Sequence, residues 1–230
     1  MTGLKLAPVA GAGLLFDIDG TLVDTDALHL QAFNEVFAPF GHGFGRDSFV
    51  TDLQGLSNEA ISGRFLANET TARRAEVMEA KEAAFRRIAQ AGLHPAPGLL
   101  ALMEAADAAG LPMAAVTNAP RLNAVLMLDA LGIRERFKAI VIGEELPRSK
   151  PHPLPYLEGL RLIGAKAEYS VAFEDSRAGI AAASAAGLPT IGLLTGLTEA
   201  ESMAAGAAMT VMDFTSPALL EFVARRVARA

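Results

Sequence analysis

The sequence predicts an α/β fold, in which a Rossmann-like parallel sheet forms a three-layer α/β/α core and an all-helical cap domain is inserted near the N-terminus. From residue 98 onward, short apolar runs alternate with longer Ala- and Leu-rich amphipathic stretches, which is the pattern of a parallel sheet flanked by helices. Between residues 25 and 93, helical periodicity continues without a convincing strand. The chain of 230 residues is long enough to bury one substantial core.

The core elements follow from this alternation. Six short apolar runs are predicted to be buried strands, at residues 14–16, 113–117, 139–142, 171–173, 190–193 and 209–212. The stretches between and after them predict crossover helices, at residues 99–109, 120–131, 154–162, 177–186 and 217–228. Glycines at the C′ position are expected to end several of these helices, namely Gly110, Gly132, Gly164 and Gly187.

The helical insert is expected to leave the core near residue 24 and to return near residue 94. The prediction is therefore a core of residues 1–24 and 94–230 and a cap of residues 25–93. The return segment contains two prolines, which suit a stiff connector between two independently packed bodies.

The longest cap helix is predicted over residues 71–91 and ends before Gly92. Glu82 and Arg86 have the spacing of an i,i+4 ion pair. The charged residues of this helix, including the basic ones, are interpreted as its solvated face.

Composition excludes several classes of function. Lys and Arg number 20 against 26 Asp and Glu, and the net charge of −6 argues against nucleic acid and anionic membranes as partners. The absence of Cys excludes disulfides, thiolate metal sites and a cysteine nucleophile. No apolar run reaches the roughly 18 residues that a membrane-spanning helix needs. We expect a cytoplasmic protein, and we predict a monomer while leaving a dimer open.

Two carboxylates directly follow the first predicted strand. Residues 14–16 lead straight into Asp17-Ile18-Asp19-Gly20-Thr21, so Asp17 and Asp19 stand at the carboxyl end of a buried strand. Open α/β sheets bind their ligands at this edge. The pentapeptide alone is equally compatible with an Asp-Gly turn that carries solvated acids.

With its flanking strand, this pentapeptide resembles the first motif of the haloacid dehalogenase superfamily, DxDGT. Three further motifs of that superfamily have counterparts here in the same order: Thr117-Asn118, Lys150 and Glu174-Asp175. The helical insert after the first motif is similar to the small cap of the β-phosphoglucomutase-like and phosphoglycolate-phosphatase-like branch. The resemblance covers nearly the whole chain.

The resemblance implies a role for each acid and for the lysine. Asp17 is expected to be the nucleophile that forms an aspartyl-phosphate, and Asp19 the general acid and base. A structural turn acid is the alternative for Asp19. Lys150 is expected to balance the charge of Asp17 and the phosphate. Asp17, the main-chain carbonyl of Asp19 and Asp175 would hold Mg²⁺, and Glu174 would contact the metal through water.

The second motif is expected to hold the transferring phosphate. Pro120 is interpreted as the first residue of a helix, so that the amides of Asn118 and Ala119 and the hydroxyl of Thr117 would face the anion. A plain helix cap is the alternative, and both interpretations can hold at once.

The cap residues bear on the substrate. By resemblance, His29 assists proton transfer, although a histidine buried within the helix is the alternative. Gln54, Gly55 and Asn58 lie in the segment that resembles the specificity loop, with Gln54 and Asn58 where phosphomutases carry Lys and Arg. The loss of two cations should weaken binding of a second phosphate. Arg64 is a weaker candidate for the cleft between cap and core.

These residues together predict a Mg²⁺-dependent phosphatase that acts on a small phosphorylated metabolite, such as a sugar phosphate or phosphoglycolate. A sugar phosphomutase is the first alternative. A non-catalytic protein that binds a phosphorylated metabolite is the second, and an acid–base residue such as Asp19 argues against it.

Overall fold

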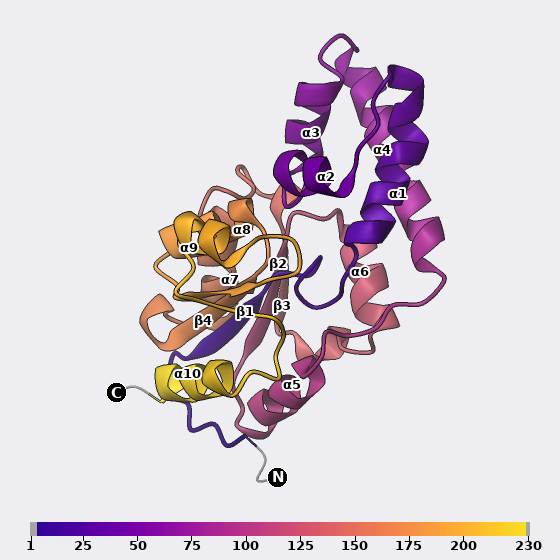
Figure 1. Ribbon diagram of the computed structural model, residues 1–230. Coiled ribbons are helices and arrows are strands. Elements are labelled where there is room, and N and C mark those ends of the chain that lie inside the picture. The colour runs from indigo at the N-terminus through magenta and orange to yellow at the C-terminus, as the bar shows by residue number, and fades with distance from the viewer. Residues whose placement is uncertain (1–3, 229–230) are drawn as a thin grey trace.

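A six-stranded parallel sheet forms the core of the computed structural model, which describes residues 4–228 (Figure 1). The strand order is β3-β2-β1-β4-β5-β6. The strands are β1 Gly13–Phe16, β2 Met113–Thr117, β3 Ala139–Ile142, β4 Ser170–Glu174, β5 Thr190–Leu193 and β6 Met209–Val211. Each predicted strand is confirmed, with ends that shift by no more than one residue.

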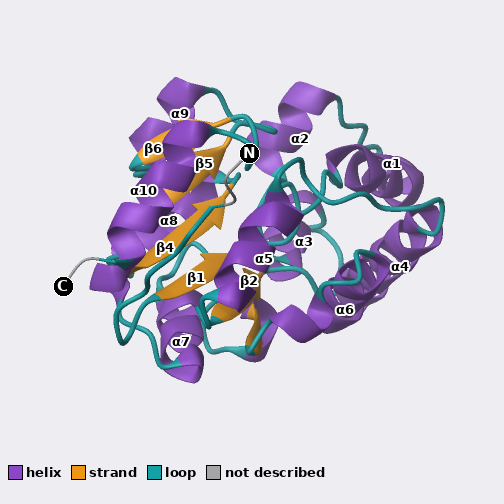
Figure 2. Cartoon of the chain, turned by 90° about the horizontal axis from the view of Figure 1, so that it is seen from below, coloured by secondary structure: helices purple, strands orange, loops and turns teal. Residues whose placement is uncertain are grey.

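Helices cover both faces of the sheet. They are α5 Leu99–Ala108, α6 Arg121–Ala130, α7 Leu154–Ile163, α8 Arg177–Ala185, α9 Glu199–Ala205 and α10 Pro217–Val227. Successive side chains of a strand point to opposite faces, so Leu14 and Phe16 pack with α5, α6 and α10, whereas Leu15 packs with α7 and α8. These two apolar layers make the predicted three-layer α/β/α arrangement (Figure 2).

The predicted helix ends are confirmed at all four glycines. Gly110, Gly132, Gly164 and Gly187 have φ values of 64°, 66°, 75° and 81°, a left-handed conformation in which a Cβ atom would be strained. The short helix α9 was not predicted. Its start is fixed by a capping box between Thr198 and Glu201.

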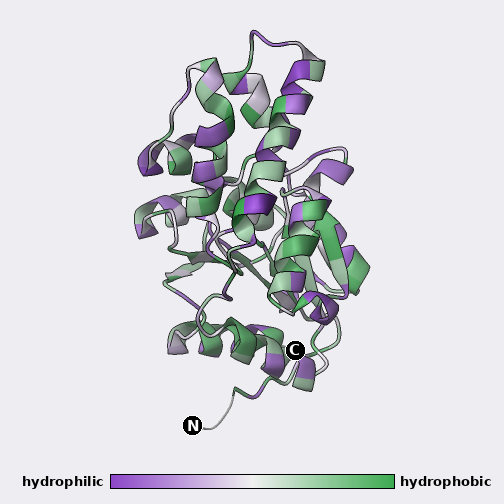
Figure 3. Ribbon diagram, turned by 90° about the vertical axis from the view of Figure 1, so that its right-hand side faces the viewer, coloured by the Kyte–Doolittle hydropathy of each residue, from purple (hydrophilic) through white to green (hydrophobic). Residues whose placement is uncertain are grey.

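Four helices form a separate layer at the carboxyl end of the sheet, and Figure 1 shows α1 and α4 side by side there. They are α1 Asp26–Phe37, α2 Arg46–Asp52, α3 Asn58–Phe65 and α4 Thr71–Ala89. Both hydrophobic and hydrophilic residues lie along each of them (Figure 3), and most of the buried apolar ones gather in a separate cluster, while a few from α1 and α4 join the cluster of the core. The buried members of the separate cluster are Phe33, Phe37, Phe49, Leu53, Ile61, Leu66, Val77 and Met78.

We call these four helices the cap. The division at residues 24 and 94 remains a prediction. Within the described residues, 4–228, no helix is both long enough and apolar enough to cross a membrane.

The prediction that the charged residues of α4 are solvated is wrong for the side of the helix that carries Lys81 and Glu82, which are both buried. Glu82 and Arg86 do not pair with each other: Glu82 is 2% exposed and accepts hydrogen bonds from Lys81 and Asn123, while Arg86 pairs with Glu79. The cause is that this side of α4 packs against α1 and the core helix α6 instead of facing solvent.

Candidate active site

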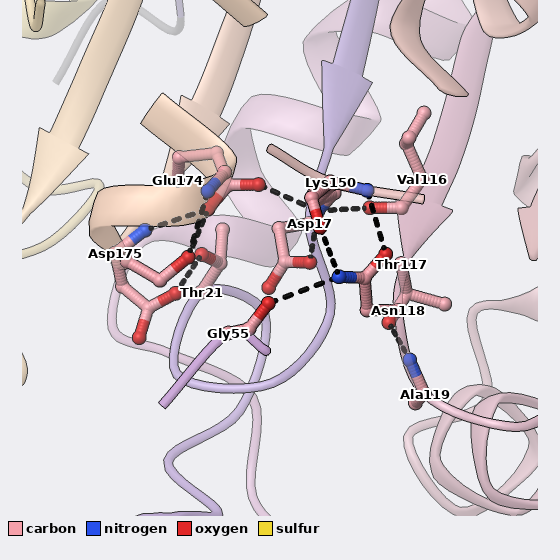
Figure 4. A network of polar contacts seen from close by, with 12 residues as sticks. Asp17, Thr21, Gly55, Val116, Thr117, Asn118, Ala119, Lys150, Glu174 and Asp175 are labelled. Atoms are coloured by element: carbon pink, nitrogen blue, oxygen red, sulfur yellow. Dashed lines mark hydrogen bonds and ion pairs between the residues drawn. The ribbon is translucent and has the colours of Figure 1, made fainter. Parts of the chain in front are cut away.

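The carboxyl ends of three adjacent strands bring the predicted motifs together. Asp17 directly follows β1, Thr117 ends β2, and Glu174 ends β4 with Asp175 just beyond. Parallel strands end at the same edge of a sheet, which explains why residues far apart in sequence meet here (Figure 4).

Lys150 lies at the centre of this group and is 3% exposed. Its ammonium donates hydrogen bonds to Asp17 Oδ1 at 2.6 Å, to Glu174 Oε1 at 2.5 Å and to the carbonyl of Val116 at 2.7 Å. Although burial opposes its charge, the carboxylates of Asp17 and Glu174 raise the pKa of Lys150. Lys150 is therefore a permanent cation against Asp17. The hydroxyl of Tyr156 donates to the same Glu174 oxygen at 2.6 Å.

Asp17, Glu174 and Asp175 form a buried acidic cluster, each with a carboxylate oxygen within 4.8 Å of the others. Burial and the neighbouring carboxylates raise the pKa of Asp17 and of Asp175 well above the usual range, even though Lys150 lowers both. One ammonium does not neutralise three carboxylates. An oxygen-only donor set with this excess negative charge fits a hard divalent cation.

The three acids of the cluster are not equivalent. One oxygen of Glu174 is used by Lys150 and Tyr156, and the other accepts from Ser176 at 3.2 Å. Asp175 lies directly against Gly20, where a Cβ atom would come within 2.0 Å of its Oδ2 atom and where φ is +74°. Glu174 thus holds Lys150 and Ser176, whereas Asp17 contacts Lys150 through Oδ1 alone and Asp175 accepts from Thr21 and Gln54. The assignment of Asp17 and Asp175 as metal ligands remains a prediction.

Asp19 faces away from the acidic cluster and toward the cap. Its Oδ1 atom accepts hydrogen bonds from Thr25 at 2.7 Å and from His29 Nε2 at 2.9 Å. Burial opposes ionisation, but the contacts with His29 and Thr25 outweigh it and lower the pKa of Asp19. The side chain of Asp19 is therefore outside the metal cluster, and only its main-chain carbonyl remains a predicted ligand.

His29 connects Asp19 to the cap helix α4. Its ring stacks on Phe85 with centroids 3.9 Å apart, and its Nδ1 atom lies 3.3 Å from the ammonium of Lys81. Lys81 is 3% exposed and pairs with Glu82 at 2.8 Å. His29 thus contacts the proposed acid–base residue Asp19, and its role in proton transfer remains a prediction.

The second motif differs in part from the prediction. Pro120 is the N-cap of α6, which begins at Arg121. The amide of Ala119 donates to Thr117 Oγ1 at 2.9 Å, so it is not a free anion donor. The side chain of Asn118 instead bridges core and cap, because it bonds both main-chain groups of Lys150 and donates to the carbonyl of Gly55 at 3.0 Å. The bond between Ala119 and Thr117, formed within the turn that precedes α6, accounts for the loss of the predicted Ala119 donor.

The predicted specificity loop reaches the core. Gln54 Nε2 donates to Asp175 Oδ2 at 2.8 Å, and Gly55 packs so closely on Ser176 that a Cβ atom would lie 2.4 Å from its hydroxyl oxygen. Asn58 lines the same pocket. Arg64 does not: it lies on the exposed side of α3, pairs with Asp52, and is absent from the lining.

A single pocket contains nearly all the predicted site residues. It is lined by Asp17, Asp19, Asp26, His29, Phe33, Phe49, Leu53, Gln54, Gly55, Leu56, Asn58, Ile61, Lys81, Glu82, Thr117, Asn118, Ala119, Pro120, Lys150 and Asp175. Sequence reasoning missed Lys81, Glu82 and Asp26. A signal for the first two was present: they share the i, i+3, i+4 stripe of α4 that carries the buried residues Met78 and Phe85.

The chain is similar in sequence and in fold to known proteins. A family model described as haloacid dehalogenase-like hydrolase matches residues 14–193, a segment that runs from β1 through β5. The chain belongs to this family. The resemblance inferred from the four motifs is confirmed, and with it the prediction of an enzyme.

Relatives in the haloacid dehalogenase-like hydrolase family cover most of the chain. Protein CbbY of Rhodobacter capsulatus is 34% identical over 77% of this chain and 83% of its own length. Phosphoglycolate phosphatase of Agrobacterium fabrum is 30% identical, with both chains covered in full. A crystal structure of a CbbY variant from Rhodobacter sphaeroides, in complex with xylulose-(1,5)bisphosphate, has a TM-score of 0.79 and 30% identity, covering 90% of this chain and 96% of that one.

Proposed function

We propose that this enzyme is a Mg²⁺-dependent phosphatase that hydrolyses a small sugar phosphate or a phosphoglycolate-like monoester through an aspartyl-phosphate on Asp17. The observation that carries the proposal is the position of Asp17. It contacts the cation Lys150, it belongs to the acidic cluster, and it faces a pocket whose other wall holds Asp19 and His29.

The first half of the reaction transfers the phosphoryl group to the enzyme. An Asp17 oxygen attacks phosphorus, the ester P–O bond breaks, and the leaving alkoxide takes a proton from Asp19. Lys150 keeps Asp17 positioned and offsets its charge while the phosphate approaches. Mg²⁺ bound by Asp17, Asp175 and the main-chain carbonyl of Asp19 would offset the charge of the phosphate oxygens.

The second half releases inorganic phosphate. Water attacks the phosphorus of the aspartyl-phosphate, Asp19 takes its proton, and the bond between Asp17 and phosphorus breaks. The lowered pKa of Asp19 favours the carboxylate that this step requires. The acid role of the first half requires that Asp19 binds a proton when the substrate enters, and His29, 2.9 Å from the same carboxylate, positions Asp19 for that role.

A phosphatase is favoured over a sugar phosphomutase by the cap. A mutase must hold a second phosphate while the sugar turns over in the pocket, and charge-assisted contacts are the strong ones for phosphate. Gln54 and Asn58 are neutral, Gln54 is bonded to Asp175, and the cap lysine Lys81 is paired with Glu82. The phosphoglycolate phosphatases among the chain's relatives also support phosphate ester hydrolysis.

The test is the release of inorganic phosphate from a panel of sugar phosphates and phosphoglycolate, with Mg²⁺ or with a chelator. We expect release that requires Mg²⁺ and that falls by roughly 10⁴-fold or more in Asp17→Asn, because the variant lacks the nucleophile. Glu76→Gln, an exposed change on α4, serves as the matched control. Isomerised sugar phosphate without free phosphate would instead identify a mutase.

A further inference from the structure

The cap side of the pocket contains a carboxylate that the proposed mechanism does not use. Glu82 lines the pocket and is 2% exposed. Its Oε1 atom accepts from Lys81 at 2.8 Å, and its Oε2 atom accepts from Asn123 of the core helix α6 at 2.6 Å. Burial opposes its charge, but Lys81 and His29 lower the pKa of Glu82, so it is an anion at neutral pH.

Both lysines of the pocket are already paired with carboxylates. Among the lining residues that the structure describes, Lys81 and Lys150 carry the permanent positive charges. Lys150 is bonded to Asp17 and Glu174, and Lys81 is bonded to Glu82. No lining cation on the cap side is left for a second anionic group.

Much of the rest of the cap wall is apolar, and its polar members, Asp26, His29, Gln54 and Asn58, include no lysine or arginine. Its apolar side chains come from α1, α2, the loop that follows α2, and α3, and they are Phe33, Phe49, Leu53, Leu56 and Ile61. The ammonium of Lys81 lies 4.4 Å from the centre of the Phe33 ring, within this wall. An anion placed here would lose its hydration and would gain no positively charged hydrogen-bond donor in return.

We propose that Glu82 makes the pocket select phosphomonoesters whose other end is uncharged, and that it rejects sugar bisphosphates. This inference rests on the proposed phosphatase function. It separates this chain from the Rhodobacter sphaeroides relative, which was crystallised with xylulose-(1,5)bisphosphate.

The physical reason is the opposite response of a carboxylate to a hydroxyl and to a phosphate. A sugar hydroxyl can donate a hydrogen bond to Glu82, and that hydrogen bond is stronger than usual because the acceptor is charged. A second phosphate dianion would meet the same carboxylate at close range in a pocket that excludes water, where like charges repel strongly. Selection therefore comes from a repulsive element as much as from an attractive one.

The experiment compares sugars that differ by one phosphate. Phosphate release is measured for fructose 6-phosphate against fructose 1,6-bisphosphate and for xylulose 5-phosphate against xylulose 1,5-bisphosphate, and the same compounds compete with p-nitrophenyl phosphate. We expect the monophosphate of each pair to have the higher kcat/KM, or the lower inhibition constant, by about tenfold or more.

Two variants test the assignment to Glu82. Glu82→Gln removes the negative charge and leaves Lys81 without its carboxylate, so the preference should move about tenfold toward the bisphosphates. Glu76→Gln, an exposed change on the same helix, should leave the preference unaltered. If Glu82→Gln unfolds, as judged by circular dichroism, the comparison of substrates in the wild-type enzyme still tests whether bisphosphates are rejected.

The outcomes separate this inference from the proposed function. Phosphate release that is equal for both members of a pair, or faster from the bisphosphates, overturns the selection by Glu82 and leaves the phosphatase intact. An unchanged preference in folded Glu82→Gln also overturns it. Failure to release phosphate from any compound contradicts the proposed function and this inference with it.

Discussion

Asp26 shows how a pocket residue can be retained at a cost to stability. It begins α1, is 6% exposed, and lies 3.4 Å from the amide nitrogen of Gln54. Burial and the charge of Asp24 raise the pKa of Asp26 from 3.8 to about 6. The folded state therefore favours the protonated form, and the protein loses stability as pH rises through this range.

We predict that Asp26→Asn raises the free energy of unfolding at neutral pH by about 2 kcal/mol. The gain should vanish toward about pH 4, where the wild-type carboxyl is protonated in the folded state. Urea unfolding of both proteins at the two pH values is the measurement. Asp47→Asn, at an exposed position in the first turn of α2, is the control. A gain that is the same at both pH values would contradict the assignment to the titration of Asp26.

Most of the core site residues could be predicted from sequence because each follows an apolar run, and parallel strands place such residues at one edge. Asp17, Thr117 and Asp175 lie where this reasoning puts them, whereas Lys150 follows no apolar run and was indicated only by the family resemblance. The sequence could not show that Lys81 and Glu82 face the pocket, since the partners that bury them, His29 and Asn123, lie 52 and 41 residues away in the chain.

The helices and strands were predictable wherever a continuous apolar run marked a strand or a glycine marked the end of a helix. Strands with continuous apolar runs and helices ended by glycine were found at the expected positions. The helix α9 was missed because its seven residues have little apolar periodicity, and only the capping pair Thr198 and Glu201 marks it. Arg64 was misplaced because a helix this short gives no clear periodicity, and its exposed side chain pairs with Asp52 outside the pocket.

Asn123 of the core helix α6 forms hydrogen bonds with two residues of the cap helix α4. Asn123 donates to Glu82 at 2.6 Å and accepts from Arg86 at 3.0 Å, and it is fully buried. From Glu82 the bonds continue through Lys81 and His29 to Asp19. The position of α4 on the core thus fixes the surroundings of the proposed acid–base group.

We predict that Asn123→Ala lowers kcat/KM by about tenfold, because a displaced α4 no longer holds His29 against Asp19. Phosphate release measures the effect, and a thermal unfolding curve shows whether the variant is folded. Leu122→Ala changes the adjacent side chain of α6, which is 64% exposed, and should leave kcat/KM near the wild-type value. Equal activity of the two variants would mean that the contact between α4 and α6 does not influence the site.

For the whole molecule, the proposed site has two halves, one at the carboxyl edge of the sheet and one on the helices and loops of the cap. The core supplies Asp17, Lys150 and the acidic cluster, and the cap supplies His29, Gln54 and the wall around Glu82. Contacts such as Gln54 with Asp175 and Asn118 with Gly55 close the pocket over the proposed nucleophile. In the proposed mechanism, this arrangement would exclude bulk water from the phosphoryl group and leave Asp19 to activate the water that reacts.

The central claim is that Asp17 carries the phosphoryl group and Asp19 removes it with water. It is tested most directly by mixing the Asp19→Asn variant rapidly with p-nitrophenyl phosphate and Mg²⁺. This substrate has a leaving group that needs no acid, so the variant should release a stoichiometric burst of p-nitrophenol and then turn over slowly. Mass spectrometry of the quenched protein should find one phosphoryl group on the peptide that contains Asp17. A burst that persists in the double variant, which carries both Asp17→Asn and Asp19→Asn, would contradict the account. A phosphoryl group on another residue would also contradict it.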